Sequence, residues 1–115
     1  MGIKERIAII ENDGGDIKEH RLHQLLELAM SVTGRGYVSD DYTKFIEFPI
    51  GDIMIFSDPY YGTVQIDETD VDSRTVQKLI TVIKKSLLKF DKKIETTRDQ
   101  AASEIFDKPI DHLMD

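Results

Sequence analysis

Two histidines and a glutamate share one side of a predicted helix near the start of the chain. His20, His23 and Glu27 are spaced i, i+3 and i+7 within residues 17–33. Imidazole nitrogens and carboxylate oxygens are ligands of Zn²⁺. On the helical wheel, however, these side chains lie opposite a leucine stripe, and a structural zinc site needs a fourth ligand. We therefore interpret them as solvated surface residues.

A second group of candidate ligands lies in the loop that precedes this helix. Residues 12–16 are rich in Asn, Asp and Gly, and their oxygens could hold Mg²⁺ or Ca²⁺. Phosphate loops occupy similar positions, but Asp13 and Asp16 would repel an anion and no Lys follows. We favour a turn with Asp16 as the helix N-cap. A metal-dependent enzyme using Asp13, Asp16, His20 and His23 is the alternative.

Basic residues gather in one segment of an otherwise acidic chain. The net charge is −7 at pH 7, whereas residues 74–93 carry a net charge of +6. Five side chains of this segment fall on the outer face of a predicted helix: Arg74, Lys78, Lys85, Lys89 and Lys92. Such a face could contact a nucleic-acid backbone or an acidic partner, although a lysine face is ordinarily solvated. Nucleic-acid binding through residues 74–92 is therefore a second alternative.

No group of residues has the pattern of a catalytic site. The chain has no cysteine, which excludes thiolate chemistry and disulfides. No Ser–His pairing is suggested, and the carboxylates lie in predicted caps and turns. We therefore predict no catalytic residue and no cofactor or metal, which favours a binding function over catalysis.

Three short strands joined by two tight turns form the centre of the predicted fold. Residues 43–48, 53–57 and 63–67 are rich in Ile, Phe, Val and Thr, which favour strands. The turns between them contain Pro and Gly, which suit tight reversals of the chain. The pattern predicts an antiparallel meander.

One further strand and two long helices surround this meander. Residues 6–10 form an apolar run without alternation, as in a strand covered on both faces. The first helix, over residues 17–33, ends at Gly34. The second, over residues 71–90, begins with carboxylates and carries an apolar stripe: Val76, Leu79, Ile80, Ile83, Leu87 and Phe90.

The predicted architecture is one α+β domain over residues 1–115, in the order β-α-β-β-β-α. Its four-stranded sheet has both long helices on one face, and residues 94–115 form a short C-terminal helix and tail. The helix–three strands–helix order resembles the double-stranded-RNA-binding domain, in element order alone. That family has a basic cluster where this chain has carboxylates: Asp67, Glu68, Asp70 and Asp72. RNA binding by that mode is therefore not expected.

The register of the meander decides which side chains face away from the helices. We prefer a register in which Ile46 faces Met54 and Phe56 faces Val64, because it makes one face wholly apolar. The other face then keeps a small apolar centre with a polar rim.

That small centre is the predicted interaction patch. It consists of Phe45, Ile53 and Ile55, and the C-terminal Ile105 and Phe106 could cover it or add to it. Alternatively, a second copy could bring its own patch and form a twofold dimer, which we favour. Four tyrosines near loops are equally consistent with an interface or with anchoring on the core: Tyr37, Tyr42, Tyr60 and Tyr61.

The composition bounds the location and class of the protein. No apolar run approaches the ~20 residues of a membrane span, and the charged start predicts no signal peptide. Together with the absence of cysteine, this predicts a cytoplasmic protein. Few Asn and Gln are also typical of a heat-adapted source. We thus predict a small acidic cytoplasmic protein that acts by binding another protein or itself, as a homodimer.

Overall fold

Three helices and one five-stranded sheet form the part of the chain that the computed structural model describes, residues 2–13 and 17–93. In chain order the elements are α1 (Ile3–Asp13), α2 (Lys18–Thr33), β1 (Tyr37–Val38), β2 (Ile46–Ile50), β3 (Ile53–Asp58), β4 (Thr63–Ile66), β5 (Thr69–Asp70) and α3 (Ser73–Lys93). The predicted α+β class is confirmed. The predicted C-terminal helix and tail lie outside the described residues.

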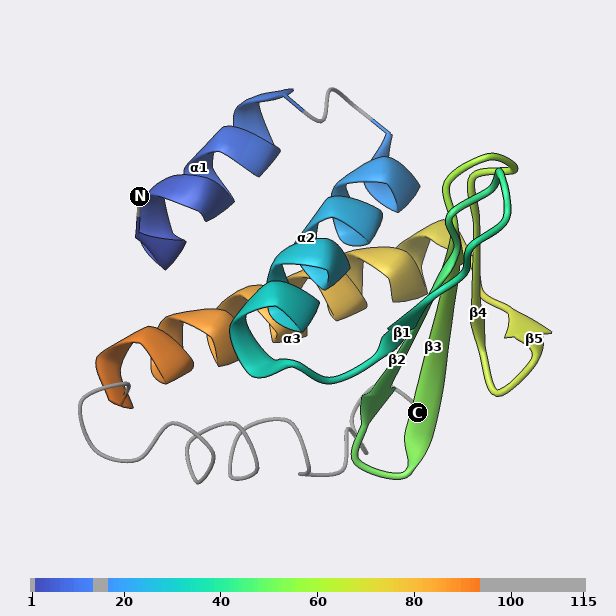
Figure 1. Cartoon of the computed structure of the whole chain (residues 1–115). Helices are drawn as coiled ribbons and strands as arrows, with labels where there is room; N and C mark the ends of the chain where they lie inside the picture. Colours follow the sequence, from blue (N-terminus) through green and yellow to red (C-terminus); the bar gives the residue numbers. More distant parts are fainter. Residues whose placement is uncertain (1, 14–16, 94–115) are drawn as a thin grey trace.

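The sheet is antiparallel throughout, in the order β1-β2-β3-β4-β5. The predicted meander is its centre, β2 to β4, and two short strands that the sequence did not reveal flank it. Figure 1 shows the three helices on one side of the sheet, with α3 running from the sheet toward the far side of the molecule. No described helix therefore covers the second sheet face.

The strand predicted over residues 6–10 is wrong, because these residues belong to α1. Ile3 and Ile7 are buried and Ile10 is half-buried, a spacing of i, i+4 and i+7 along one side of a helix. An apolar run of five residues fits a buried strand and a helix face equally well. The choice depends on packing against α2 and α3, which α1 contacts.

The two long helices lie where they were predicted, and α2 ends as expected. Its N-cap residue is Ile17 instead of the predicted Asp16, and α3 spans Ser73–Lys93 instead of residues 71–90. Gly34 ends α2 in the left-handed region at φ 72°, and its N–H donates to the Met30 carbonyl at 2.8 Å. At the start of α3, the Asp72 carboxylate accepts a hydrogen bond from the Thr75 N–H at 2.8 Å. This hydrogen bond holds the pKa of Asp72 below its ordinary value. Every residue of the predicted α3 stripe is buried.

The register between β2 and β3 differs from the predicted one. Ile46 pairs with Ser57, and Ile50 pairs with Ile53 across the two-residue turn Gly51-Asp52. Gly51 has φ 57°, which a two-residue hairpin turn requires at its first position. The predicted partner of Ile46 was Met54, three residues before Ser57, and a shift by an odd number of residues exchanges the two faces of β3. On the other side of β3, Phe56 pairs with Gln65 instead of the predicted Val64.

One sheet face thus belongs to the hydrophobic core. It buries alternate side chains of the central strands beneath α2 and α3: Ile46, Phe48, Ile50, Ile55, Val64 and Ile66. Each such side chain contributes on the order of 1.5–3 kcal/mol by leaving water. Among the described helices, none has the length and apolar character to cross a membrane.

Candidate functional site

The sheet face turned away from the helices carries an apolar floor with acidic residues around it. We call it the open sheet face, and it consists of Phe45, Glu47, Met54, Phe56 and Gln65 with the turn residues Asp67 and Glu68. Met54 is 40% exposed, and Phe45 and Phe56 are half-buried. A hollow of about 660 Å³ opens over this face, lined by Met54 and Phe56 and by polar side chains.

Aromatic stacking fixes the floor of the open sheet face. The rings of Phe45 and Phe56 are stacked with centroids 4.7 Å apart, and Tyr37 of β1 tilts against Phe45 at 6.2 Å. Such ring pairs contribute about 0.5–1.5 kcal/mol beyond burial. The floor is therefore a surface of packed aromatic rings on the face that the described helices leave uncovered.

The β4–β5 turn supplies two carboxylates of the rim. Asp67 and Glu68 form this two-residue turn, with φ 48° and 70°. Both values lie in the left-handed region, where Asn and Gly are the usual residues. The Asp67 carboxylate accepts a hydrogen bond from the Met54 N–H at 3.1 Å, which ties the turn to β3. The turn thus holds acidic side chains in a backbone conformation that is unfavourable for them.

The rim is negative and its lining contains no cation. Glu47, Asp67 and Glu68 line the hollow, and no Lys or Arg does so among the described residues. Gln65 donates through Nε2 to the Asp70 carboxylate at 2.8 Å, which holds its amide at the edge of the floor. The face can therefore contact an apolar group at its centre and positive charge around it.

Of the three sheet residues predicted to form the interaction patch, one lies on the open sheet face. Phe45 lies on the open sheet face. Ile55 is fully buried beneath the helices, and Ile53 is half-buried against the same core, so their prediction as patch residues is wrong. The β3 residues that do lie on this face, the exposed Met54 and the half-buried Phe56, were predicted on the buried face. Ile105 and Phe106 lie outside the described residues.

A buried Ser57–His23 pair connects α2 to the sheet, with the exposed Glu27 beside the histidine, and no sequence pattern indicated it. A hydrogen bond of 2.9 Å joins His23 Nδ1 to Ser57 Oγ, and His23 Nε2 lies 3.7 Å from Glu27 Oε1. The order matches a nucleophile, a base and a carboxylate. Ser57 is only 1% exposed, however, and lies on the covered sheet face, so a substrate cannot reach its hydroxyl. The pair is a structural link.

The prediction that His23 faces water is wrong. It is buried because the sheet packs on α2 on one side while α1 and α3 pack on others. Burial lowers the pKa of His23 below its ordinary value, against the opposing effect of the Glu27 and Asp58 carboxylates, while the neighbouring His20 lowers it further. The side chain is therefore neutral at physiological pH.

The residues of the predicted metal alternative do not form a metal site within the described part of the chain. Asp13 is exposed at the end of α1, His20 is exposed, and His23 is bound to Ser57. No three His, Asp or Glu side chains of residues 2–13 and 17–93 are grouped as metal ligands. Asp16 lies outside the described residues.

Three of the four tyrosines form an exposed cluster rather than anchors on the core. Tyr42 meets Tyr60 edge-on at 5.3 Å, and Tyr60 meets Tyr61 in the same way at 4.8 Å. The loops that carry them are held by aspartates: the Asp41 carboxylate accepts from the Thr43 N–H, and that of Asp58 accepts from the Tyr60 N–H, both at 2.9 Å. The three rings form an exposed aromatic cluster at the loops.

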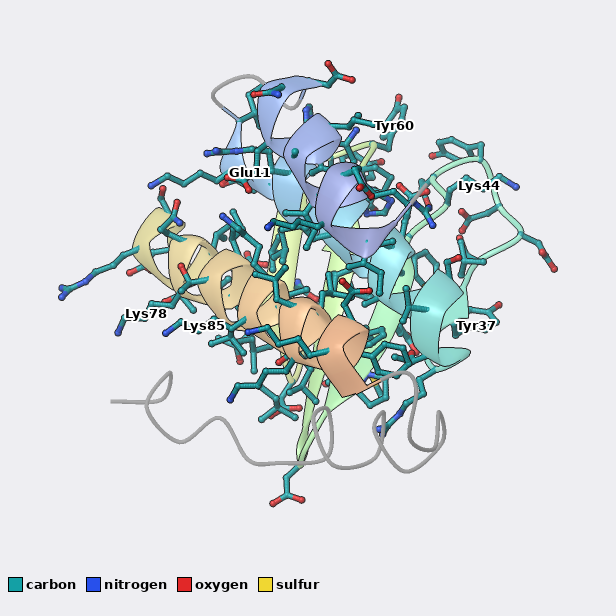
Figure 2. All side chains as sticks on the ribbon, turned by 90° about the vertical axis from the view of Figure 1, so that its left-hand side faces the viewer. Glu11, Tyr37, Lys44, Tyr60, Lys78 and Lys85 are labelled. Atoms are coloured by element: carbon teal, nitrogen blue, oxygen red, sulfur yellow. The ribbon has the colours of Figure 1, made fainter. Side chains whose placement is uncertain are left out.

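The basic residues predicted on the outer face of α3 are exposed, except that Lys78 is half-buried. Figure 2 shows Lys78 and Lys85 extending outward from this helix. Lys84, at the border of this face, is 2.9 Å from the Glu11 carboxylate of α1. We call Arg74, Lys78, Lys85, Lys89 and Lys92 the basic face of α3.

Comparison with protein-family models, with curated proteins and with solved structures finds no match to this chain. The function is therefore inferred from the chemistry of these surfaces.

Proposed function

We propose that this protein acts by protein–protein interaction, and that its open sheet face docks a positively charged protein surface with an apolar side chain at its centre. The observation that carries the proposal is the floor formed by the exposed Met54 and the half-buried Phe45 and Phe56, with carboxylates around it. Aromatic residues and Met are enriched in protein interfaces, which have an apolar centre and a polar rim. Contiguous apolar patches on a surface are often functional.

The charge of the rim selects the partner. A Lys or Arg side chain can pair with Glu47, Asp67 or Glu68 while its charge lies over the Phe56 ring. Complementary charge also steers association and suppresses wrong partners. An acidic partner would meet three carboxylates and no compensating cation in the described lining.

The same argument changes the predicted mode of self-association. In a twofold dimer through the open sheet face, the carboxylates of Glu47, Asp67 and Glu68 in one copy would approach those of the other. Like charges placed together at an interface cost several kcal/mol. We therefore propose a basic partner surface in place of the twofold pairing of identical patches.

Two short peptides test this proposal on the full chain. The first is Lys-Lys-Leu-Lys-Lys, and the second is its acidic counterpart Glu-Glu-Leu-Glu-Glu. We expect the basic peptide to shift the NMR signals of the Met54 methyl group and the Phe56 ring in a salt-dependent manner. Equal shifts with both peptides, or no shift with either, would contradict the proposal.

Charge removal on the rim sharpens the peptide experiment. The double variant Glu47→Gln, Glu68→Gln should weaken binding of the basic peptide, by about 0.2–1 kcal/mol for each exposed pair lost. Glu5→Gln is the control, because Glu5 is exposed on α1, away from the open sheet face. An unchanged affinity in the double variant would remove the charge-based argument.

A further inference from the structure

The C-terminal half of α3 presents an exposed apolar side chain among lysines. Leu88 is 36% exposed, close to the 40% of Met54 on the open sheet face. One helical turn to either side lie Lys85 and Lys92, both exposed and both in the basic face of α3. The remaining neighbours at this spacing are Lys84, paired with Glu11, and the exposed Asp91. Leu88 is thus an apolar projection with a mainly positive border.

This surface is the chemical complement of the open sheet face. The sheet has a hollow with an apolar floor and three carboxylates, while α3 has an apolar projection and lysines. Oppositely charged rims around matching apolar centres are the arrangement of a specific interface. One chain therefore carries both halves of a complementary pair.

The two halves cannot meet within one molecule. The open sheet face looks away from the helices, whereas α3 runs to the opposite side of the molecule (Figure 1). A contact between them must join two copies and use a different surface on each. Such a heterologous contact leaves the open sheet face free at one end of the assembly and the basic face of α3 free at the other.

We propose that a second copy of this chain docks Leu88 and the basic face of its α3 on the open sheet face, so that the protein assembles head to tail. This inference rests on the proposed function, because it names the basic surface that the open sheet face receives. The contact inserts Leu88 over Met54 and Phe56 and brings Lys85 and Lys92 to the acidic rim. Assembly then grows with concentration and weakens with salt.

Sedimentation velocity of the full chain provides the first test. We expect the average mass to rise with protein concentration at about 0.1 M salt, where the Debye length is about 10 Å, and to fall toward the monomer at about 1 M salt. A monomer at every concentration and both salt levels would overturn the inference.

Two single variants and their mixture test the head-to-tail geometry. Met54→Lys places a cation in the hollow, and Leu88→Glu places a carboxylate on the projection, so each should weaken association by at least about 100-fold. Mixed together, they should form a 1:1 complex that stops at two chains, because one variant keeps an intact α3 and the other an intact sheet face. Ile9→Lys is the control, since Ile9 is an exposed apolar residue on α1.

The other outcomes separate the competing geometries. A twofold dimer through the sheet would leave Leu88→Glu associated like the wild type and would give no new complex in the mixture, which overturns the inference. Circular dichroism of each variant checks that its fold is retained. If the wild type stays monomeric but the peptide Lys-Lys-Leu-Lys-Lys still shifts Met54, the second copy is rejected while the proposed function stands. If neither association nor peptide binding occurs, both fail.

Discussion

The two faces of the sheet use alternate residues of the same strands and have opposite properties. On β3, Ile55 and Ser57 face the helices and are buried, while Met54 and Phe56 face outward at the hollow. Both faces are largely apolar along this strand, so hydrophobicity alone does not distinguish them. The difference comes from what surrounds each one: the helical layer packs on the covered face, where α2 contacts β2 and β3, and a rim of carboxylates borders the open one. The covered face should determine stability, and the open face should determine binding.

The largest expected effect comes from truncating the covered face. Phe48 is fully buried on β2, so Phe48→Ala should lower the free energy of unfolding by about 3–5 kcal/mol. Met54→Ala on the open sheet face should change it by less than about 0.5 kcal/mol. Chemical denaturation of both variants measures the difference. Comparable losses would show that the open face is also part of the stabilising core.

Gly36, just before β1, lies close to residues of β2. A Cβ at Gly36 would lie 2.9 Å from Phe48 Cδ2 and 3.0 Å from the Glu47 carbonyl oxygen, and Gly36 has φ 91°. Gly36→Ala should therefore cost about 1–3 kcal/mol and move β1 with Tyr37 away from β2. Gly34→Ala is the matched control, because Gly34 has φ 72° but open space around it.

The Gly34→Ala control separates the cost of the steric contact at Gly36 from the cost of the left-handed backbone conformation. Gly34→Ala should cost only the left-handed conformation, about 1 kcal/mol. Equal costs for the two variants in thermal denaturation would mean that the close approach of Gly36 to β2 contributes nothing.

Acid should weaken the covered face first, through His23. Its pKa is lowered in the folded protein, so the unfolded chain binds the proton more readily. Stability is therefore complete above pH about 6.5, and declines as pH falls from there toward the lowered pKa. His23→Gln should remove this decline, whereas His20→Gln, at an exposed position, should retain it. Denaturation midpoints measured across this pH range test the assignment, and an unchanged decline in His23→Gln would contradict it.

The smallest expected effect concerns the strained turn of the open face. Glu68 has φ 70°, a conformation that costs a non-glycine residue about 1–2 kcal/mol, against about 0.5–1 kcal/mol of extra entropy lost by glycine. Glu68→Gly should thus raise stability slightly, by about 0.5 kcal/mol, and weaken binding of the basic peptide. A variant that becomes more stable and binds equally well would show that Glu68 has no part in docking.

The elements with strong periodicity could be predicted from the sequence alone. The stripe of α3, from Val76 to Phe90, matches a helix over many turns, and no other period fits it. Gly34 marks the end of α2, because a left-handed residue there is nearly the property of glycine alone. The strands of the meander follow from their β-branched and aromatic residues.

The remaining features were decided by tertiary packing. Residues 53–56 are all apolar, so β3 carries no alternation of its own, and the two-residue turn at Gly51 determines that Met54 and Phe56 face outward. The apolar run of α1 became helical because α2 and α3 cover it. His23 is buried for a similar reason: a helical wheel describes one helix by itself, while α2 is enclosed by elements on several sides. A local pattern determines which residues share a face, and only the packing of distant segments decides which face meets water.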